Sequence, residues 1–224
     1  MCDLGARAVS CGVLGLGRTG TLARTFRSFS YVLSDRQADA VWLGSGRAQQ
    51  GQGGIPTLLI ANPVYPDRYY VQITRVLVGG LPLQIPPGAL DIRQSDSTGG
   101  VYLSTTIPIG MVLKGEVYDL LKAALQSSLG TPDANSRWPC YFAGARKVPF
   151  PPTITLVFAN NAVMALQPGT GGSVWYMRKD GAQCLAVLRS RTGETILGTR
   201  VQIGRLMTYN YKLAADGVFG TVTF

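Results

Sequence analysis

Short apolar segments rich in Val, Ile, Thr, Tyr and Phe recur along the chain, and Gly, Pro, Asn or Asp bounds each of them. β-Branched and aromatic residues between turn residues are typical of β-strands. After residue 54 we expect these extended segments: Thr57–Ile60, Tyr69–Val78, Leu81–Ile85, Val101–Thr106, Thr153–Phe158, Ser173–Met177, Cys184–Leu188, Thr195–Leu197, Leu206–Lys212 and Val218–Phe224. The pattern predicts a mainly β protein.

One segment among these strands has the spacing of a strong helix. Its apolar residues from Val117 to Leu125 recur every three or four positions, after Lys114-Gly115-Glu116. Gly130 and Pro132 follow, and both residue types end helices. One helix among many strands favours antiparallel pairing over a repeated strand–helix–strand fold.

The first 45 residues have a different pattern, which we interpret as strand, turn, short helix and strand. The expected strands are at Val13-Leu14 and Tyr31–Leu33, and the expected helix covers Leu22–Phe29. Gly44–Gly54 is rich in Gly and Gln, as a flexible linker would be. We therefore divide the chain into residues 1–54 and 55–224.

A glycine motif lies between the first two of these elements. Gly15, Gly17 and Gly20 have the spacing of the dinucleotide fingerprint, in which glycines let the backbone approach a pyrophosphate, and Asp35 follows at the usual distance. A dinucleotide-binding domain needs several further strand–helix units, which the rest of the sequence does not offer. The motif therefore favours a tight glycine turn, with nucleotide binding as an alternative.

The charge and the chemistry-bearing residues limit the possible functions. Lys and Arg number 21 and Asp and Glu number 12, a formal charge of +9, but the basic residues are scattered, which makes nucleic-acid binding an unlikely role. The sequence has no His, which excludes Ser-His and Cys-His catalysis and His metal ligands. Its four cysteines form no Cys-x-x-Cys pair. We expect no metal and no cofactor.

The first twenty residues lack the basic head and the continuous apolar stretch of a signal peptide. No apolar run has the length needed to cross a membrane. As written, the sequence therefore predicts a cytoplasmic protein with no membrane contact.

Asp96-Ser97-Thr98-Gly99 is similar to the Asp-Thr/Ser-Gly triplet of aspartic proteases. That triplet needs Gly directly after the hydroxyl residue, and Thr98 intervenes here. The surrounding composition is typical of a solvated turn, so we do not expect Asp96 to be catalytic.

An ordered series of segments resembles the plant nepenthesin-type aspartic proteases. The segments are Gly12–Arg18, Phe29–Tyr31, Leu43-Gly44, Tyr69–Val71, Val78–Gly80, Ile85–Pro87, Gly99–Val101, Val117–Leu125, Trp138–Tyr141, Pro152–Phe158, Cys184–Ala186, Ile196–Gly198 and Tyr211–Leu213. The cereal xylanase inhibitors derived from that family share the series. The resemblance implies a pepsin-like carboxy-terminal lobe at residues 55–224, preceded at residues 1–54 by a remnant of a truncated amino-terminal lobe.

The resemblance also implies where the catalytic turn of this lobe would be. In the family each lobe supplies one Asp from an Asp-Thr/Ser-Gly turn, and the pair activates a water. The matching position here reads Leu103-Ser104-Thr105-Thr106, so that Leu replaces the Asp and Thr105 replaces the Gly. The other turn would lie upstream of residue 1. We therefore expect no aspartic endopeptidase activity.

The function that follows is that of a pseudoenzyme, a protein-binding or inhibitor-like protein in plant defence or development. The expected partner is another protein of unknown identity, with self-association or pairing with a lobe from another chain as further possibilities. The alternative is a residual aspartic endopeptidase. Because the family is usually secreted, the resemblance and the missing signal peptide point to different locations.

Structural roles are implied as well. Cys140 and Cys184 match the cysteine pair of the family's carboxy-terminal lobe, whereas Cys2 and Cys11 have no assigned role. Ile196-Leu197-Gly198 matches the segment that crosses behind the catalytic turn. We expect Leu103, Ile196 and Leu197 to be buried close together, and the surface at residues 104–108 to be uncovered.

Overall fold

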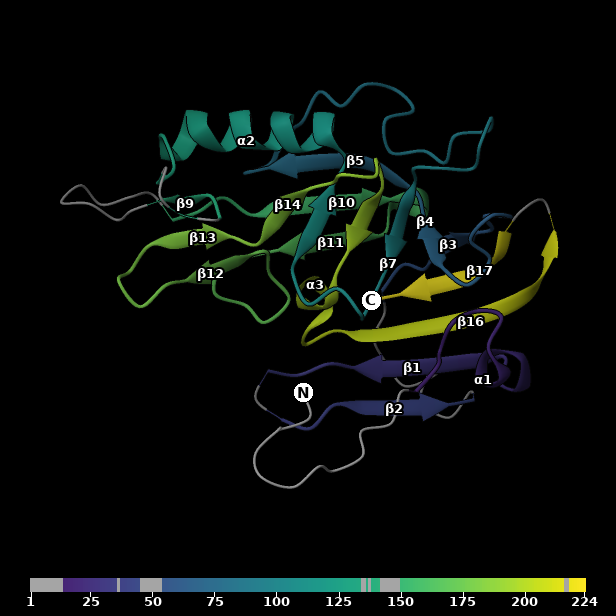
Figure 1. Ribbon diagram of the computed structural model, residues 1–224. Coiled ribbons are helices and arrows are strands. Elements are labelled where there is room, and N and C mark those ends of the chain that lie inside the picture. The colour runs from purple at the N-terminus through teal and green to yellow at the C-terminus, as the bar shows by residue number, and fades with distance from the viewer. Residues whose placement is uncertain are drawn as a thin grey trace.

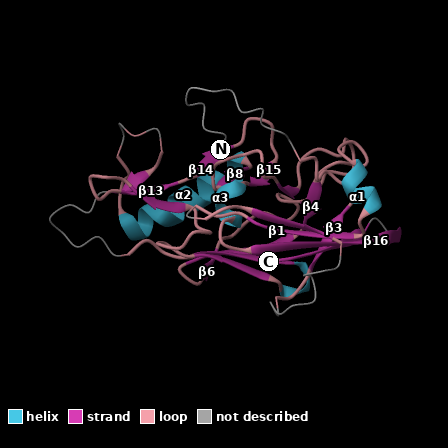
Figure 2. Cartoon of the chain, turned by 90° about the horizontal axis from the view of Figure 1, so that it is seen from below, coloured by secondary structure: helices cyan, strands magenta, loops and turns pink. Residues whose placement is uncertain are grey.

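The computed structural model describes residues 14–35, 37–44, 54–133, 136, 138–141, 150–215 and 218–224. These residues form a mainly β protein, as the sequence predicts, with three sheets and a few helices (Figure 1). The sheet of β12 and β13 (Trp175–Met177, Gln183–Leu185) lies at the end of the molecule opposite α1 (Thr21–Thr25) (Figure 2). No described helix is long and apolar enough to span a membrane.

A ten-stranded sheet joins the first and the last parts of the described chain. In spatial order its strands are β14 (Val187–Arg189), β8 (Met111–Leu113), β15 (Thr195–Leu197), β7 (Val101–Leu103), β4 (Tyr69–Val71), β3 (Thr57–Ile60), β17 (Val218–Thr223), β16 (Leu206–Ala215), β1 (Ser28–Val32) and β2 (Ala40–Leu43). Two neighbouring pairs are parallel, β15 with β7 and β14 with β8, and the other pairs are antiparallel.

Two smaller sheets complete the β structure. One has the order β11 (Val163–Leu166), β10 (Ile154–Phe158), β5 (Ile73–Val78) and β6 (Leu81–Pro82). The other places β13 between β12 and β9 (Cys140–Tyr141). Both are wholly antiparallel, so that their inward side chains alternate with outward ones.

Four helical segments connect or cover the strands. They are α1, α2 (Gly115–Leu129), the single turn η1 (Ala159–Asn161) and α3 (Thr199–Gln202). In α2 the residues Val117, Leu121 and Leu125 are buried on one face, which is the helical spacing that the sequence predicts. The helix ends where Gly130 adopts a φ of 83°, a conformation that favours glycine.

Several boundaries differ from those that we expected. The helix expected at Leu22–Phe29 ends at Thr25 in the structure. The prediction is wrong for the residues after Thr25, since Phe29 is in β1, where it pairs with Leu43 and Tyr209. Leu14 is described outside any strand, and Val13 lies outside the described residues. The strand expected at Val101–Thr106 ends at Leu103. Strands β2, β8, β9 and β11 were not predicted, since each has at most four residues.

The expected division at residue 54 does not separate two sheets. Strands β1 and β2 belong to residues 1–54, yet β1 pairs over five residues with β16 from the end of the chain. Most of the expected linker Gly44–Gly54 lies outside the described residues. The interpretation of residues 1–54 as a lobe remnant stays a prediction.

Aromatic rings from distant strands pack together on one face of the ten-stranded sheet. The ring centres of Phe29 and Tyr209 are 4.6 Å apart and stacked, and those of Tyr69 and Tyr209 are 4.7 Å apart. The hydroxyls of Tyr31 and Tyr209 are 3.2 Å apart, and those of Tyr69 and Tyr211 are 2.5 Å apart. Burial raises the pKa of Tyr69 to about 12 and that of Tyr209 well above its ordinary value.

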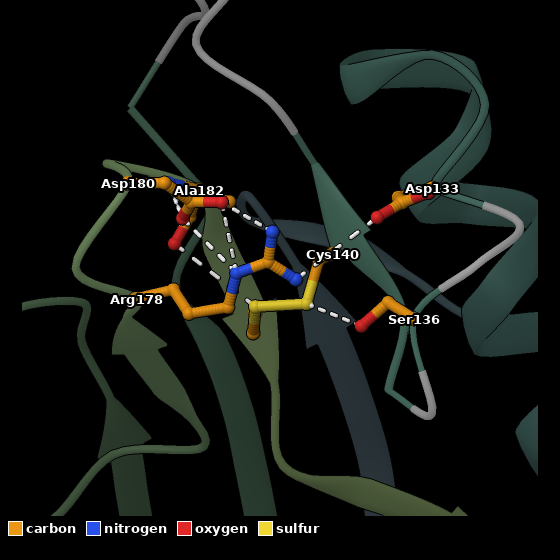
Figure 3. Close-up of a disulfide and its surroundings, with 7 residues drawn as sticks. Asp133, Ser136, Cys140, Arg178, Asp180 and Ala182 are labelled. Carbon is orange, nitrogen blue, oxygen red and sulfur yellow. Dashed lines mark hydrogen bonds and ion pairs between the residues drawn. A yellow bond between two sulfur atoms is a disulfide. The ribbon is translucent and has the colours of Figure 1, made fainter.

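A disulfide joins Cys140 of β9 to Cys184 of β13, the pair that the resemblance implies. The two residues are directly opposite in the strand pair, and both are fully buried. Figure 3 shows Arg178 beside this bridge, where its guanidinium forms an ion pair with Asp180 and lies 4.0 Å from a carboxylate oxygen of Asp133. The main-chain N–H of Asp133 donates to the carbonyl oxygen of Cys140 at 2.7 Å.

Replacing both bridge cysteines, Cys140→Ala with Cys184→Ala, should lower the free energy of unfolding by about 3–4 kcal/mol, because the bridge closes a long loop of the unfolded chain. Urea unfolding of the wild type and of the double variant measures the difference. With a thiol reductant present, the difference should shrink to the small effect of the lost side chains. Equal stability of the two proteins without reductant would contradict the prediction.

The raised pKa values predict how stability falls at alkaline pH. In the unfolded chain tyrosines titrate near 10, whereas the pKa of buried Tyr69 is about 12 and that of buried Tyr209 is well above its ordinary value. The stabilisation is therefore complete below about pH 10 and is lost as the pH rises toward the folded-state pKa. Tyr209→Phe removes one such group, so above about pH 10 the free energy of unfolding of this variant should fall less steeply than that of the wild type, by roughly 1.4 kcal/mol per pH unit.

Denaturant unfolding of the wild type and of Tyr209→Phe at a series of pH values measures that slope. Alkaline-titrating groups that do not contact Tyr209 contribute equally to both proteins and cancel in the comparison. Identical slopes would mean that Tyr209 titrates normally in the folded protein.

Candidate functional site

Strand β7 ends at Leu103, the position where the resemblance expects the catalytic Asp. The Leu103 side chain is 5% exposed. The residue is paired on one side with Tyr69 of β4 and on the other with Leu197 of β15, and all three belong to the main apolar core. An isobutyl group in this place cannot bind a proton or hold a water.

The segment Ile196-Leu197-Gly198 runs beside the end of β7 and then behind the turn that follows it. The N–H of Ser104 donates to the carbonyl oxygen of Leu197 at 3.0 Å. At Gly198 a Cβ would lie 2.7 Å from the carbonyl oxygen of Ile107 and would overlap that of Ile109, so that only glycine fits this crossing.

One part of the expected packing is wrong. Leu103 and Leu197 lie in the main core, but Ile196 points to the other side of the sheet, where it packs with Tyr70 and Tyr102. Successive side chains of a strand point to opposite faces, and Ile196 directly precedes Leu197 in β15. The neighbours of Leu103 are therefore Leu197 and Tyr69.

A buried amide fixes the turn after β7. Gln202, at the end of α3, is fully buried, and its Nε2 donates to the carbonyl oxygens of Ser104, Leu197 and Gly198, each at 3.1 Å. Its Oε1 accepts a hydrogen bond from the hydroxyl of Tyr31. Sequence reasoning missed Gln202, because no local pattern marks a glutamine whose partners come from three different segments.

A hollow of about 440 Å³ opens in front of this turn. Four segments and one single strand residue line it. They are residues 14–17, Phe29 and Tyr31 of β1, residues 67–69, residues 102–107, and Tyr209 of β16. The walls thus combine the glycine motif, the aromatic face of the sheet and the turn where the catalytic Asp is expected.

Asp67 is the carboxylate among the described residues that line this hollow. Two residues of the glycine motif form hydrogen bonds with it: the hydroxyl of Thr19 donates to its carboxylate, and the N–H of Arg18 donates to its carbonyl oxygen at 3.3 Å. The described part of the chain contains no cluster of three His, Cys, Asp or Glu that could hold a metal. The described lining of the hollow therefore has one carboxylate and no pair that could share a proton.

Arg68 is the basic residue in the lining. Its guanidinium forms an ion pair of 2.5 Å with Glu194 and stacks over the rings of Tyr65 at 4.0 Å and Tyr102 at 4.5 Å. Burial works against the charge of Arg68, but hydrogen bonds to Glu194 and Tyr70 outweigh it and raise its pKa. The charge is thus held in place beside the hollow.

The glycine motif forms a closed turn here. The N–H of Gly20 donates to the carbonyl oxygen of Gly17 at 2.9 Å, and the carbonyl oxygen of Leu16 accepts from the hydroxyl of Tyr69. The helix that follows, α1, has only five residues. The N–H groups of Arg18 and Gly20 are bonded within the protein, whereas a dinucleotide site would aim such groups at a pyrophosphate.

Asp96 lies away from the hollow lining, in an exposed turn. Its carboxylate accepts from the N–H of Thr98 at 3.0 Å and forms an ion pair with Arg93 at 3.1 Å. Hydrogen bonds from Thr98 lower its pKa. A carboxylate bonded in this way holds a solvated turn together, as the surrounding composition indicates.

The chain is similar to known proteins over most of its length. The family model described as xylanase inhibitor C-terminal matches residues 68–214, more than half of the chain. The chain is 26% identical over 233 aligned positions to Protein ASPARTIC PROTEASE IN GUARD CELL 2 of Arabidopsis thaliana, covering 96% of this chain and 46% of that protein. The chain thus spans about half the length of the curated relative that it matches.

Two solved structures have the same fold. The crystal structure of edgp superimposes with a TM-score of 0.69 at 19% identity, covering 92% of this chain and 58% of that one. Basic 7S globulin from soybean superimposes with a TM-score of 0.66 at 18% identity, covering 88% and 52%. Together with the domain match, these likenesses show that the chain belongs to the xylanase inhibitor C-terminal family, an aspartic-protease-like family with a pepsin-like fold.

Proposed function

We propose that this chain is a non-catalytic member of its family and that it binds a segment of another protein in the hollow in front of β7. The observation that carries the proposal is the buried Leu103 at the end of that strand, where the resemblance expects an acid. The apolar side chain packs in the core beside the close crossing at Gly198.

The chemistry of peptide hydrolysis supports a non-catalytic role. Aspartic proteases need two adjacent carboxylates, one ionised and one protonated, to activate a water. In the described lining only Asp67 carries a carboxylate, and Thr19 donates a hydrogen bond to it. A single carboxylate bound in this way has no second acid with which to share a proton.

The composition of the hollow supports protein binding. The lining combines apolar and aromatic side chains, among them Leu16, Phe29 and Tyr31, with the hydroxyl-bearing residues Ser104–Thr106 and with Arg68. Pockets of this mixed character combine apolar contact area with a few fixed polar groups that set orientation. The name of the family makes glycoside hydrolases one class of partner to test.

Leu103→Asp should lower the free energy of unfolding by a few kcal/mol at neutral pH, because it places an unpaired carboxylate in the apolar core. The loss should diminish toward about pH 4, where protonation removes the charge. Leu103→Asn is the matched control, since it has a similar shape and no titration and should show no such pH dependence. Urea unfolding at both pH values measures the difference.

The same Leu103→Asp protein should show no peptidase activity with an acid-pH peptide substrate, because no second carboxylate faces the new one. Turnover by the wild type, or turnover gained in this variant and blocked by a transition-state mimic, would overturn the non-catalytic assignment. Wild-type stability of the variant at neutral pH would show that the position is not buried.

Thr105→Arg should weaken binding of a protein partner at least tenfold, because the long charged side chain would project from the exposed turn into the hollow. Thr192→Arg is the matched control, an equally exposed threonine in a turn outside the hollow lining. A partner is identified by affinity capture from plant tissue and mass spectrometry, and its affinity for the three proteins is then measured by calorimetry. Equal affinity for all three would place the interface elsewhere.

A further inference from the structure

Strand β2 forms one edge of the ten-stranded sheet and pairs only with β1 among the described residues. The N–H of Gly44 donates to the carbonyl oxygen of Ser28 at 2.8 Å, and the register pairs Trp42 with Ser30. Because bonded and non-bonded pairs alternate in an antiparallel ladder, Trp42 directs its main-chain groups toward β1. The N–H and C=O groups of Val41 and Leu43 therefore point outward from the sheet.

This edge lacks the usual protection against pairing. Ala40–Leu43 contains no charged residue and no proline, and the side chains of Val41 and Leu43 are 41% and 38% exposed. Exposed edge strands commonly carry charges or prolines, or are covered by another element, to prevent association. The opposite edge, β14, has such protection, because Arg189 forms an ion pair with Asp119 and α2 contacts the strand.

The exposed side chains continue the aromatic face of the sheet. Leu43 is opposite Phe29 and Val41 is opposite Tyr31, so these pairs project to the same side. Phe29 and Tyr31 also line the hollow. The apolar surface thus runs from the hollow to the free edge of β2.

We propose that two copies of this protein associate through antiparallel pairing of their β2 strands about a twofold axis at Trp42. In this register Val41 of the first copy is opposite Leu43 of the second, and Leu43 of the first copy is opposite Val41 of the second. Both residues have outward main-chain groups, so the two pairs form four hydrogen bonds and join the two sheets into one. The Trp42 side chains of the two copies meet on the opposite face.

The strand's own symmetry and charge favour a second copy as the occupant. The outward residues are two positions apart around a central one, so the edge is complementary to itself in the antiparallel direction. Two copies, each with a net charge of +9, repel each other. This repulsion opposes contact least at a segment without charged residues, such as Ala40–Leu43. The contact is small, so the dimer is weak and depends on concentration. This association is independent of the proposed binding in the hollow.

Sedimentation equilibrium of the full chain, up to about 1 mM where contacts of this size become measurable, tests the pairing. The average mass should rise with concentration from 23.9 kDa toward twice that value. Val41→Pro removes an outward N–H and no bond to β1, so it should leave a folded monomer. Leu43→Lys should do the same by charge repulsion. Val163→Lys, at an exposed valine in edge strand β11, should associate like the wild type.

The register has its own test, since residues at the twofold axis approach to a Cα distance of about 4.5 Å, within disulfide range. Trp42→Cys should therefore form a covalent dimer on mild oxidation, whereas Val163→Cys and the wild type should not. A wild type that stays monomeric at all concentrations overturns the proposal. So does a dimer that persists in Leu43→Lys, or one in which Trp42→Cys fails to cross-link.

Discussion

The buried amide of Gln202 holds together the parts of the structure that meet below the hollow. It donates to the turn after β7 and to the crossing of β15, and it accepts a hydrogen bond from Tyr31 of β1. If one of these buried hydrogen bonds were broken, the loss of free energy would be comparable to the full desolvation cost of the amide. These segments are therefore fixed relative to one another. The described part of residues 1–54 is thereby tied to the rest of the chain.

This arrangement explains how the fold accommodates an apolar residue at the position where the resemblance expects the catalytic Asp. The crossing at Gly198 depends on the absence of a side chain and on main-chain hydrogen bonds, and none of these involves the side chain of Leu103. Leu103 adds apolar contacts with Leu197 and Tyr69, which an ionised acid would not make. Scaffold and chemistry are therefore separable at this site.

Charged groups near the hollow are occupied by partners within the protein. Arg68 is paired with Glu194 and stacked on aromatic rings, and Asp67 receives a hydrogen bond from Thr19. Groups fixed in this way contribute a stable electrostatic surface. Such a surface suits recognition of a partner better than turnover of a substrate.

The sequence by itself determined the mainly β class, the helix at Gly115–Leu129, the lack of histidine chemistry and the Leu at position 103, because each depends on residue type or on local periodicity. Only the tertiary structure decided that Phe29 is in a strand, that Ile196 points away from Leu103, and that Gln202 bonds to three distant segments. These features arise from pairing between residues far apart in the chain. A local sequence pattern does not identify these partners, because the residues come together only when the sheet forms.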